Sequence, residues 1–144
     1  MRTVMMSNSG TNGVARTASR GLNIALWILQ ALLAALFLWH GQFMAFPPAD
    51  MVAMINENVG PGLRVFIGVA EILAAVGLIL PGLTRILPAL TALAAAGLMI
   101  VMSSASVFHL FRGETSSAIS AFVIFLLVTV VAYARWKPVP IAPR

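Results

Sequence analysis

Four stretches of the chain are apolar almost without interruption: residues 22–46, 63–80, 86–109 and 118–133. Short polar segments separate them, among them PGLTR after the second stretch and FRGETSS after the third. A transmembrane strand needs only ~9–11 residues, whereas a helix needs ~20 to cross a bilayer. The lengths therefore predict four transmembrane helices, and we expect Pro81-Gly82 to end the second.

The composition indicates a protein that has the bilayer as its solvent. Hydrophobic residues make up 60% of the chain and charged residues 9%, against about 25% charged residues in soluble domains. We predict an all-α fold, an integral membrane four-helix bundle formed by residues 22–136. Residues 1–21, which are rich in Ser, Thr, Asn and Gly, are expected to be a disordered tail, and residues 137–144 a C-terminal tail.

Basic residues gather on one side of the predicted membrane domain. Three precede the first span, one lies between the second and third, and three follow the fourth: Arg2, Arg16, Arg20, Arg85, Arg135, Lys137 and Arg144. Because Lys and Arg are enriched in cytoplasmic loops, both termini are predicted to be cytoplasmic. This orientation also accounts for the net charge of +5 without a nucleic acid partner. Residues 47–62 then face outward, with a short helix expected around residues 49–58.

Glu71 is the one acidic residue within the second span. Arg64 and Gly68, before it in the chain, and Ala75 and Leu78, after it, lie on the same helix face as Glu71, because residues three, four and seven apart share a face. An ionisable side chain inside a span is expensive and normally faces the bundle or a wet cavity. This face is therefore predicted to point inward.

Other polar side chains fall in the same outer half of the membrane. His40 lies about 9 Å before the end of the first span at 1.5 Å per residue, and Ser106 and His109 share a face near the end of the third. We therefore expect an outward-opening pocket whose candidate ligand-binding residues are Glu71, His40, Arg64 and Ser106, with His109 and Arg112 at its rim.

Each candidate also has a structural interpretation. Glu71 could be a protonated hydrogen-bonding group that holds the bundle together, with His40 as its partner. Arg64 and Arg112 could lie among lipid headgroups, as cations at span ends commonly do, and His109 could be interfacial. Small residues four apart, such as Ala70 and Ala74, are typical of ordinary helix packing, with a homo-oligomer interface as the alternative.

Several chemistries are disfavoured. The chain has no cysteine, so thiol chemistry is excluded. Two histidines and a carboxylate match the ligands of a non-haem iron site, but their spacing does not support one. Their depths also disfavour a bis-histidine haem, and no metal site is predicted. P-loop, GxGxxG, HExxH and GxSxG signatures are absent, so no residue is assigned a catalytic role.

Three sequence boxes resemble the DoxX-like family of small prokaryotic membrane proteins. They are LWHGQFMAF, GVAE with the following LILPGLTRILP, and FHLFRGE. The recurring family positions present here are Gly41, Glu71, His109, Arg112 and Glu114. Family members often carry a lysine three residues after the glycine, where this chain has Met44.

The resemblance implies a four-helix bundle in the prokaryotic inner membrane. One relative is a small subunit of a thiosulfate:quinone oxidoreductase, others are linked to oxidative or quinone stress, and a distant animal branch assists receptor assembly. We therefore expect a quinone-linked or redox-stress accessory protein, with a quinone as its ligand and another membrane protein or a redox protein as its partner. The alternatives are a non-enzymatic scaffold or assembly factor and a binder of a small hydrophobic molecule.

Overall fold

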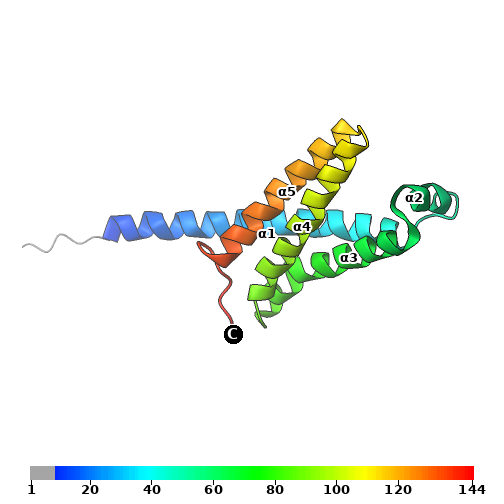
Figure 1. Ribbon diagram of the computed structural model, residues 1–144. Helices are drawn as coiled ribbons and strands as arrows, with labels where there is room; N and C mark the ends of the chain where they lie inside the picture. Colours follow the sequence, from blue (N-terminus) through cyan, green and yellow to red (C-terminus); the bar gives the residue numbers. More distant parts are fainter. Residues whose placement is uncertain (1–8) are drawn as a thin grey trace, which may run out of the picture.

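The computed structural model describes the backbone of residues 9–144 and the side chains of residues 19–144. Within this part of the chain the structure is all-helical and contains no strand (Figure 1). Its helices are α1 (Ser9–Ala45), α2 (Val52–Val59), α3 (Pro61–Thr84), α4 (Ala89–Phe111) and α5 (Thr115–Trp136). All but α2 contain a stretch long and apolar enough to cross a membrane, which in α1 begins at Ser19. The prediction of four helical spans is confirmed.

Two predicted boundaries differ from the structure. α1 begins at Ser9, so the segment expected to be a disordered tail is helical from that residue on, and residues 1–8 lie outside the described chain. Extending an existing helix avoids the cost of nucleation, so a segment containing Ala and Arg can join it. The expected break at Pro81-Gly82 is wrong, because α3 continues to Thr84. Membrane helices tolerate an internal proline. The residue that follows α3, Arg85, has a left-handed φ of 57° and caps the helix.

The helices associate as two pairs. α1 packs along α3, α4 packs along α5, and α3 joins the pairs by packing on α4, whereas α1 and α5 touch only locally. Figure 1 shows the α4–α5 pair crossing the α1–α3 pair. The core at this crossing draws on all four long helices and includes Phe37, Leu78, Leu98, Val128 and Val131. Because lipid tails around the spans are as apolar as the side chains, this packing rather than burial from water holds the bundle together.

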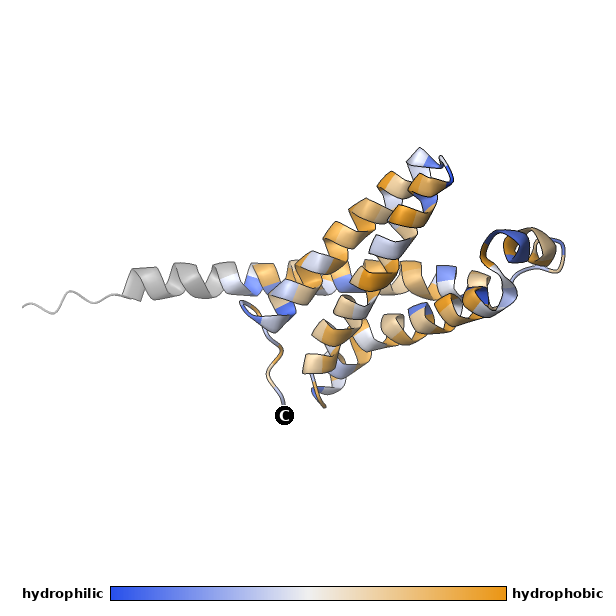
Figure 2. Ribbon diagram, in the orientation of Figure 1, coloured by the Kyte–Doolittle hydropathy of each residue, from blue (hydrophilic) through white to orange (hydrophobic). Residues whose placement is uncertain are grey.

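The outer faces of the four spans are apolar. Large side chains such as Phe66, Leu73, Ile100 and Val130 are exposed there, and Figure 2 shows hydrophobic residues along the lengths of α1, α3, α4 and α5. Hydrophilic residues concentrate at α2 and at the turn between α4 and α5 in the same view. The protein is therefore a multi-pass membrane protein whose long helices contact the lipid bilayer.

The bundle has two distinct ends. We define the loop end as α2, the start of α3 and the α4–α5 turn, residues 112–114. We define the terminal end as the α3–α4 turn, residues 85–88, together with residues 137–144. Helix α2 confirms the expected short helix in the loop between the first two spans.

Candidate functional site

Two glycines bring α1 and α3 together near the loop end. A Cβ atom on Gly68 would lie 2.7 Å from the carbonyl oxygen of Gly41, and a Cβ on Gly41 would lie 2.8 Å from that of Gly68. Real Cβ atoms essentially never approach backbone atoms so closely. The two backbones therefore touch without intervening side chains, as small residues permit in membrane helices.

This crossing places His40 beside Glu71. The Nδ1 atom of His40 lies 2.6 Å from Oε2 of Glu71, forming a hydrogen bond between α1 and α3. The Glu71 side chain is only 1% exposed, whereas that of His40 is 40% exposed. Among the described residues, none provides a hydrogen-bond partner for the buried Oε1 of Glu71. The pair thus connects a buried carboxyl group to an imidazole that is open to the surroundings of the bundle.

Arg64 lies on the same face of α3 as Glu71 but has other partners. Its Nε atom donates to Oδ1 of Asn56 at 2.9 Å, and its Nη1 atom donates to the carbonyl oxygens of Met44 and Ala45. These carbonyls belong to the last turn of α1, where the helix has no N–H donors of its own to offer them. Arg64 therefore caps α1 and anchors α2, and the structure does not place it against Glu71.

His109 and Arg112 form a second cluster with Glu114. His109 Nδ1 lies 2.6 Å from Glu114 Oε2, and Arg112 Nε lies 2.8 Å from Oε1 of the same carboxylate. Arg112 Nη2 also donates to Oδ1 of Asn58 at 2.8 Å, which connects the α4–α5 turn to α2. The Arg112 guanidinium, followed by His109, lowers the pKa of the Glu114 carboxyl group. His109, Arg112 and Glu114 thus form a hydrogen-bonded clamp that holds the α4–α5 turn to α2.

Ser106 has a packing role in this structure. Its hydroxyl group donates to the carbonyl oxygen of Ala118 at 3.0 Å, and the residue is buried. The bond joins α4 to α5 two turns from the loop end. Thus the structure brings together His40 with Glu71, and His109 with Arg112, but it places Arg64 and Ser106 on separate backbone and side-chain partners.

Within the residues whose side chains are described, no three His, Cys, Asp or Glu side chains converge as metal ligands would. Each histidine lies instead in a hydrogen-bonded His–Glu pair, His40 with Glu71 and His109 with Glu114. Such pairs can hold and move protons, because the carboxyl group stabilises the imidazolium form of the ring beside it.

The model of the DoxX-like family matches residues 28–132. The chain belongs to the DoxX-like family. The match covers the crossing of Gly41 with Gly68 and both His–Glu pairs. No curated protein and no solved structure matches the chain.

This DoxX-like protein has a further buried polar cluster, at the terminal end, that the sequence did not predict. Arg135 is only 4% exposed. Its Nε atom donates to Oε1 of Gln30 and its Nη1 atom to Oδ1 of Asn23, each at 2.6 Å. Gln30 in turn donates to the carbonyl oxygen of Leu78 at 2.6 Å. The signal in the sequence was the polar stripe of Asn23, Trp27 and Gln30 on the first span, which needs a polar partner.

Proposed function

We propose that this DoxX-like protein is a quinone-binding accessory subunit of a redox system in the prokaryotic inner membrane. The observation that carries the proposal is the His40–Glu71 pair, in which a buried carboxyl group accompanies a half-exposed imidazole inside a membrane span. A quinone needs an apolar environment for its tail and hydrogen-bonding groups for its carbonyls. Both lie together at this position.

The pair suits the proton chemistry of a quinone. With Nδ1 bound to Glu71, the imidazolium form of His40 has its Nε2–H group left to donate to a quinone carbonyl. Reduction to the quinol takes two electrons and two protons. In this proposal the electrons come from a partner redox protein, one proton comes through His40 and the other from solvent. The Glu71 carboxylate stabilises the imidazolium before transfer and reprotonation after it.

The neighbours of His40 support a ring-shaped ligand. Trp39 and Phe43 stack with their ring centroids 6.4 Å apart on the same helix, and Trp39 is 67% exposed. Offset stacking on such rings is favourable for a flat aromatic or quinonoid ligand. A ligand entering from the lipid would therefore meet an aromatic surface next to a hydrogen-bond donor.

The test measures quinone binding by the purified full-length protein in lipid nanodiscs, with decylubiquinone and a short-chain menaquinone as probes. His40→Gln should weaken binding about tenfold, the scale of one lost charge-assisted hydrogen bond. The matched control is His109→Gln, which changes the other His–Glu pair and should bind as the parent does. Equal affinities for the two variants would contradict the proposal.

A third variant, Glu71→Gln, distinguishes the competing function, that of a membrane scaffold or assembly factor. The scaffold would be favoured if neither the parent nor Glu71→Gln binds quinone and if the variant loses a membrane protein that co-purifies with the parent. Glu71→Gln that retains the partner and loses the quinone would favour the redox function.

A further inference from the structure

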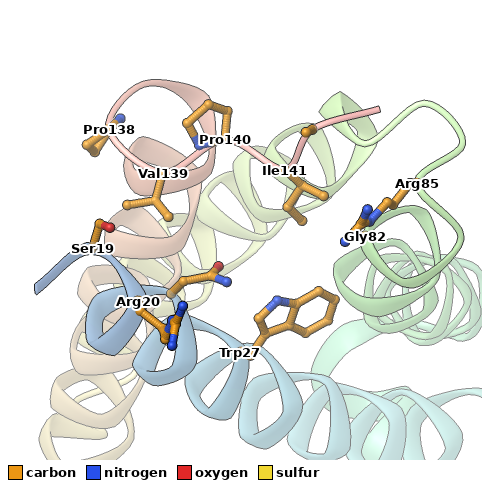
Figure 3. A pocket seen from close by; sticks show the side chains of 11 residues that line it. Ser19, Arg20, Trp27, Gly82, Arg85, Pro138, Val139, Pro140 and Ile141 are labelled. Carbon is orange, nitrogen blue, oxygen red and sulfur yellow. The ribbon is translucent and has the colours of Figure 1, made fainter. Parts of the chain in front are cut away.

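The terminal end of the bundle contains a cavity of about 460 Å³. It lies between the first described turns of the α1 span, the end of α3 and the segment that follows α5 (Figure 3). The residues that matter for its chemistry are Arg20, Asn23, Trp27, Gly82, Arg85 and Ile141. In Figure 3 the segment carrying Pro138 to Ile141 passes over the cavity, with Trp27 on the opposite wall.

Buried Arg135 supports the wall of this cavity. It donates to the lining residue Asn23, and its guanidinium carbon lies 5.4 Å from the ring centroid of Trp27. It also donates to the carbonyl oxygen of Val139, at 3.3 Å, in the covering segment. Its Nη2 atom is buried and has no hydrogen-bond partner among the described residues. A buried cation outside the lining thus holds Asn23, Trp27 and the covering segment in position.

Two other guanidinium groups, those of Arg20 and Arg85, line the cavity itself. Arg20 and Arg85 are exposed, and in the described part of the chain neither these two nor Arg135 forms an ion pair. The lining contains no acidic residue. Arginine side chains bind phosphate oxygens through paired N–H donors, so the cavity has the charge and the donors for a phosphate group.

The covering segment gives the cavity a fixed shape. The backbone nitrogen of Arg144 donates to the carbonyl oxygen of Arg85 at 3.3 Å, which connects the covering segment to the α3–α4 turn. A Cβ on Gly82 would lie 2.8 Å from Cδ1 of Ile141 and 2.9 Å from Cη2 of Trp27. The absence of a side chain at Gly82 therefore allows both groups to close around the end of α3.

The geometry points to a binding site for the phosphate of an anionic phospholipid headgroup. The guanidinium groups match the phosphate, and Trp27 provides an apolar wall beside it, where the glycerol backbone would lie. Tryptophan is enriched at this depth of a membrane protein, and basic pockets between membrane helices bind anionic headgroups. The volume far exceeds that of inorganic phosphate, which favours a lipid as the source of the phosphate group.

The experiment uses the full-length protein, delipidated in detergent and examined by native mass spectrometry. Phosphatidylglycerol is the anionic probe, phosphatidylcholine the zwitterionic reference, and inorganic phosphate the soluble competitor. We expect phosphatidylglycerol to be retained preferentially. Arg85→Gln should weaken its retention about fivefold, the scale of one cation at a membrane surface. The matched control is Lys137→Gln, which removes an exposed cation from the same end but outside the cavity lining.

A second variant leaves the charges intact. Gly82→Val places a branched side chain against Trp27 and Ile141 and should reduce phosphatidylglycerol retention without changing that of phosphatidylcholine. Displacement of the lipid by millimolar inorganic phosphate would support a phosphate site whose ligand is soluble. Losses of equal size in Arg85→Gln and Lys137→Gln, or equal retention of the two lipids by the parent, would overturn the proposal.

Discussion

Gly41 of α1 and Gly68 of α3 meet backbone to backbone, so that a methyl group on either would collide with the carbonyl oxygen of the other. The His40–Glu71 bond lies beside this approach, with Nδ1 and Oε2 2.6 Å apart, so side chains that pushed the two helices apart here would lengthen or break it. The crossing is therefore the feature that assembles the candidate site.

The first prediction concerns this crossing. Gly68→Ala should destabilise the protein by about 1–3 kcal/mol, the usual range for overpacking a tight contact. Gly97→Ala is the control, because Gly97 lies within α4 and a Cβ there would meet nothing within 4 Å. This control should be neutral or stabilising by up to about 1 kcal/mol through helix propensity. Thermal unfolding in detergent measures the stability of both variants. Equal stabilities of Gly68→Ala and Gly97→Ala would show that α1 and α3 can move apart without a loss of stability.

The second prediction concerns the buried carboxyl group. Glu71→Ala should destabilise the protein by about 1–3 kcal/mol, since His40 loses its partner and a cavity replaces the side chain. Glu71→Gln should lose less, because its amide can still hydrogen-bond to the imidazole. Denaturation in increasing sodium dodecyl sulfate ranks the variants. An alanine variant as stable as the glutamine variant would rule out an energetic role for the His40–Glu71 bond.

The third prediction is a pH dependence at the loop end. The pKa of Glu114 is lowered from its ordinary value of 4.5, chiefly by Arg112 and then by His109. A lowered folded-state pKa gives a contribution to stability that is complete above about pH 4.5 and disappears as the pH falls through the folded value. Carbon-detected NMR of the Glu114 carboxyl group should give a midpoint below 4.5.

Arg112→Gln should raise the Glu114 midpoint more than His109→Gln does, since Arg112 is the larger cause. The reverse order would mean that His109, and not the guanidinium, controls the ionisation of the clamp.

The fourth prediction concerns the buried arginine at the terminal end. Gln30→Leu removes the acceptor for Arg135 Nε and the donor to the Leu78 carbonyl. We expect a loss of about 1.5–3 kcal/mol, the range for a hydrogen bond to a charged group. Ser120→Ala, which removes an exposed hydroxyl group from α5, should change stability by less than about 0.5 kcal/mol. A similarly small effect of Gln30→Leu would show that water replaces the amide.

The sequence predicted what local patterns determine. Apolar length determined the four spans, and the rarity of an acid inside a span indicated that Glu71 faces inward, where the structure pairs it with His40. The partners of Arg64 could not be predicted from the sequence, because they depend on where the end of α1 lies relative to the start of α3. Helix register between separate spans is set by packing, as at Gly41 and Gly68, and not by any one segment.

Arg135 shows a second limit. A cation at the end of a span is commonly exposed to water or headgroups, yet this one is buried by residues more than a hundred positions earlier in the chain. Pro81 shows a third, since an internal proline that would be costly in a helix in water is tolerated within α3, which continues to Thr84. For Arg135, contacts distant in sequence override a local rule, and for Pro81 the membrane setting does.

The two hydrogen bonds of the Gln30 side chain form with helices that are synthesised at different times. Its amide nitrogen binds the third helix and its amide oxygen binds the fifth. Because chains emerge from the ribosome N-terminus first, α1 and α3 can associate through Gln30 while its oxygen still lacks its partner. That acceptor is satisfied only when Arg135 has been synthesised. One glutamine side chain thus joins helices that are synthesised at different times, and its set of hydrogen bonds is complete only once the last span has been made.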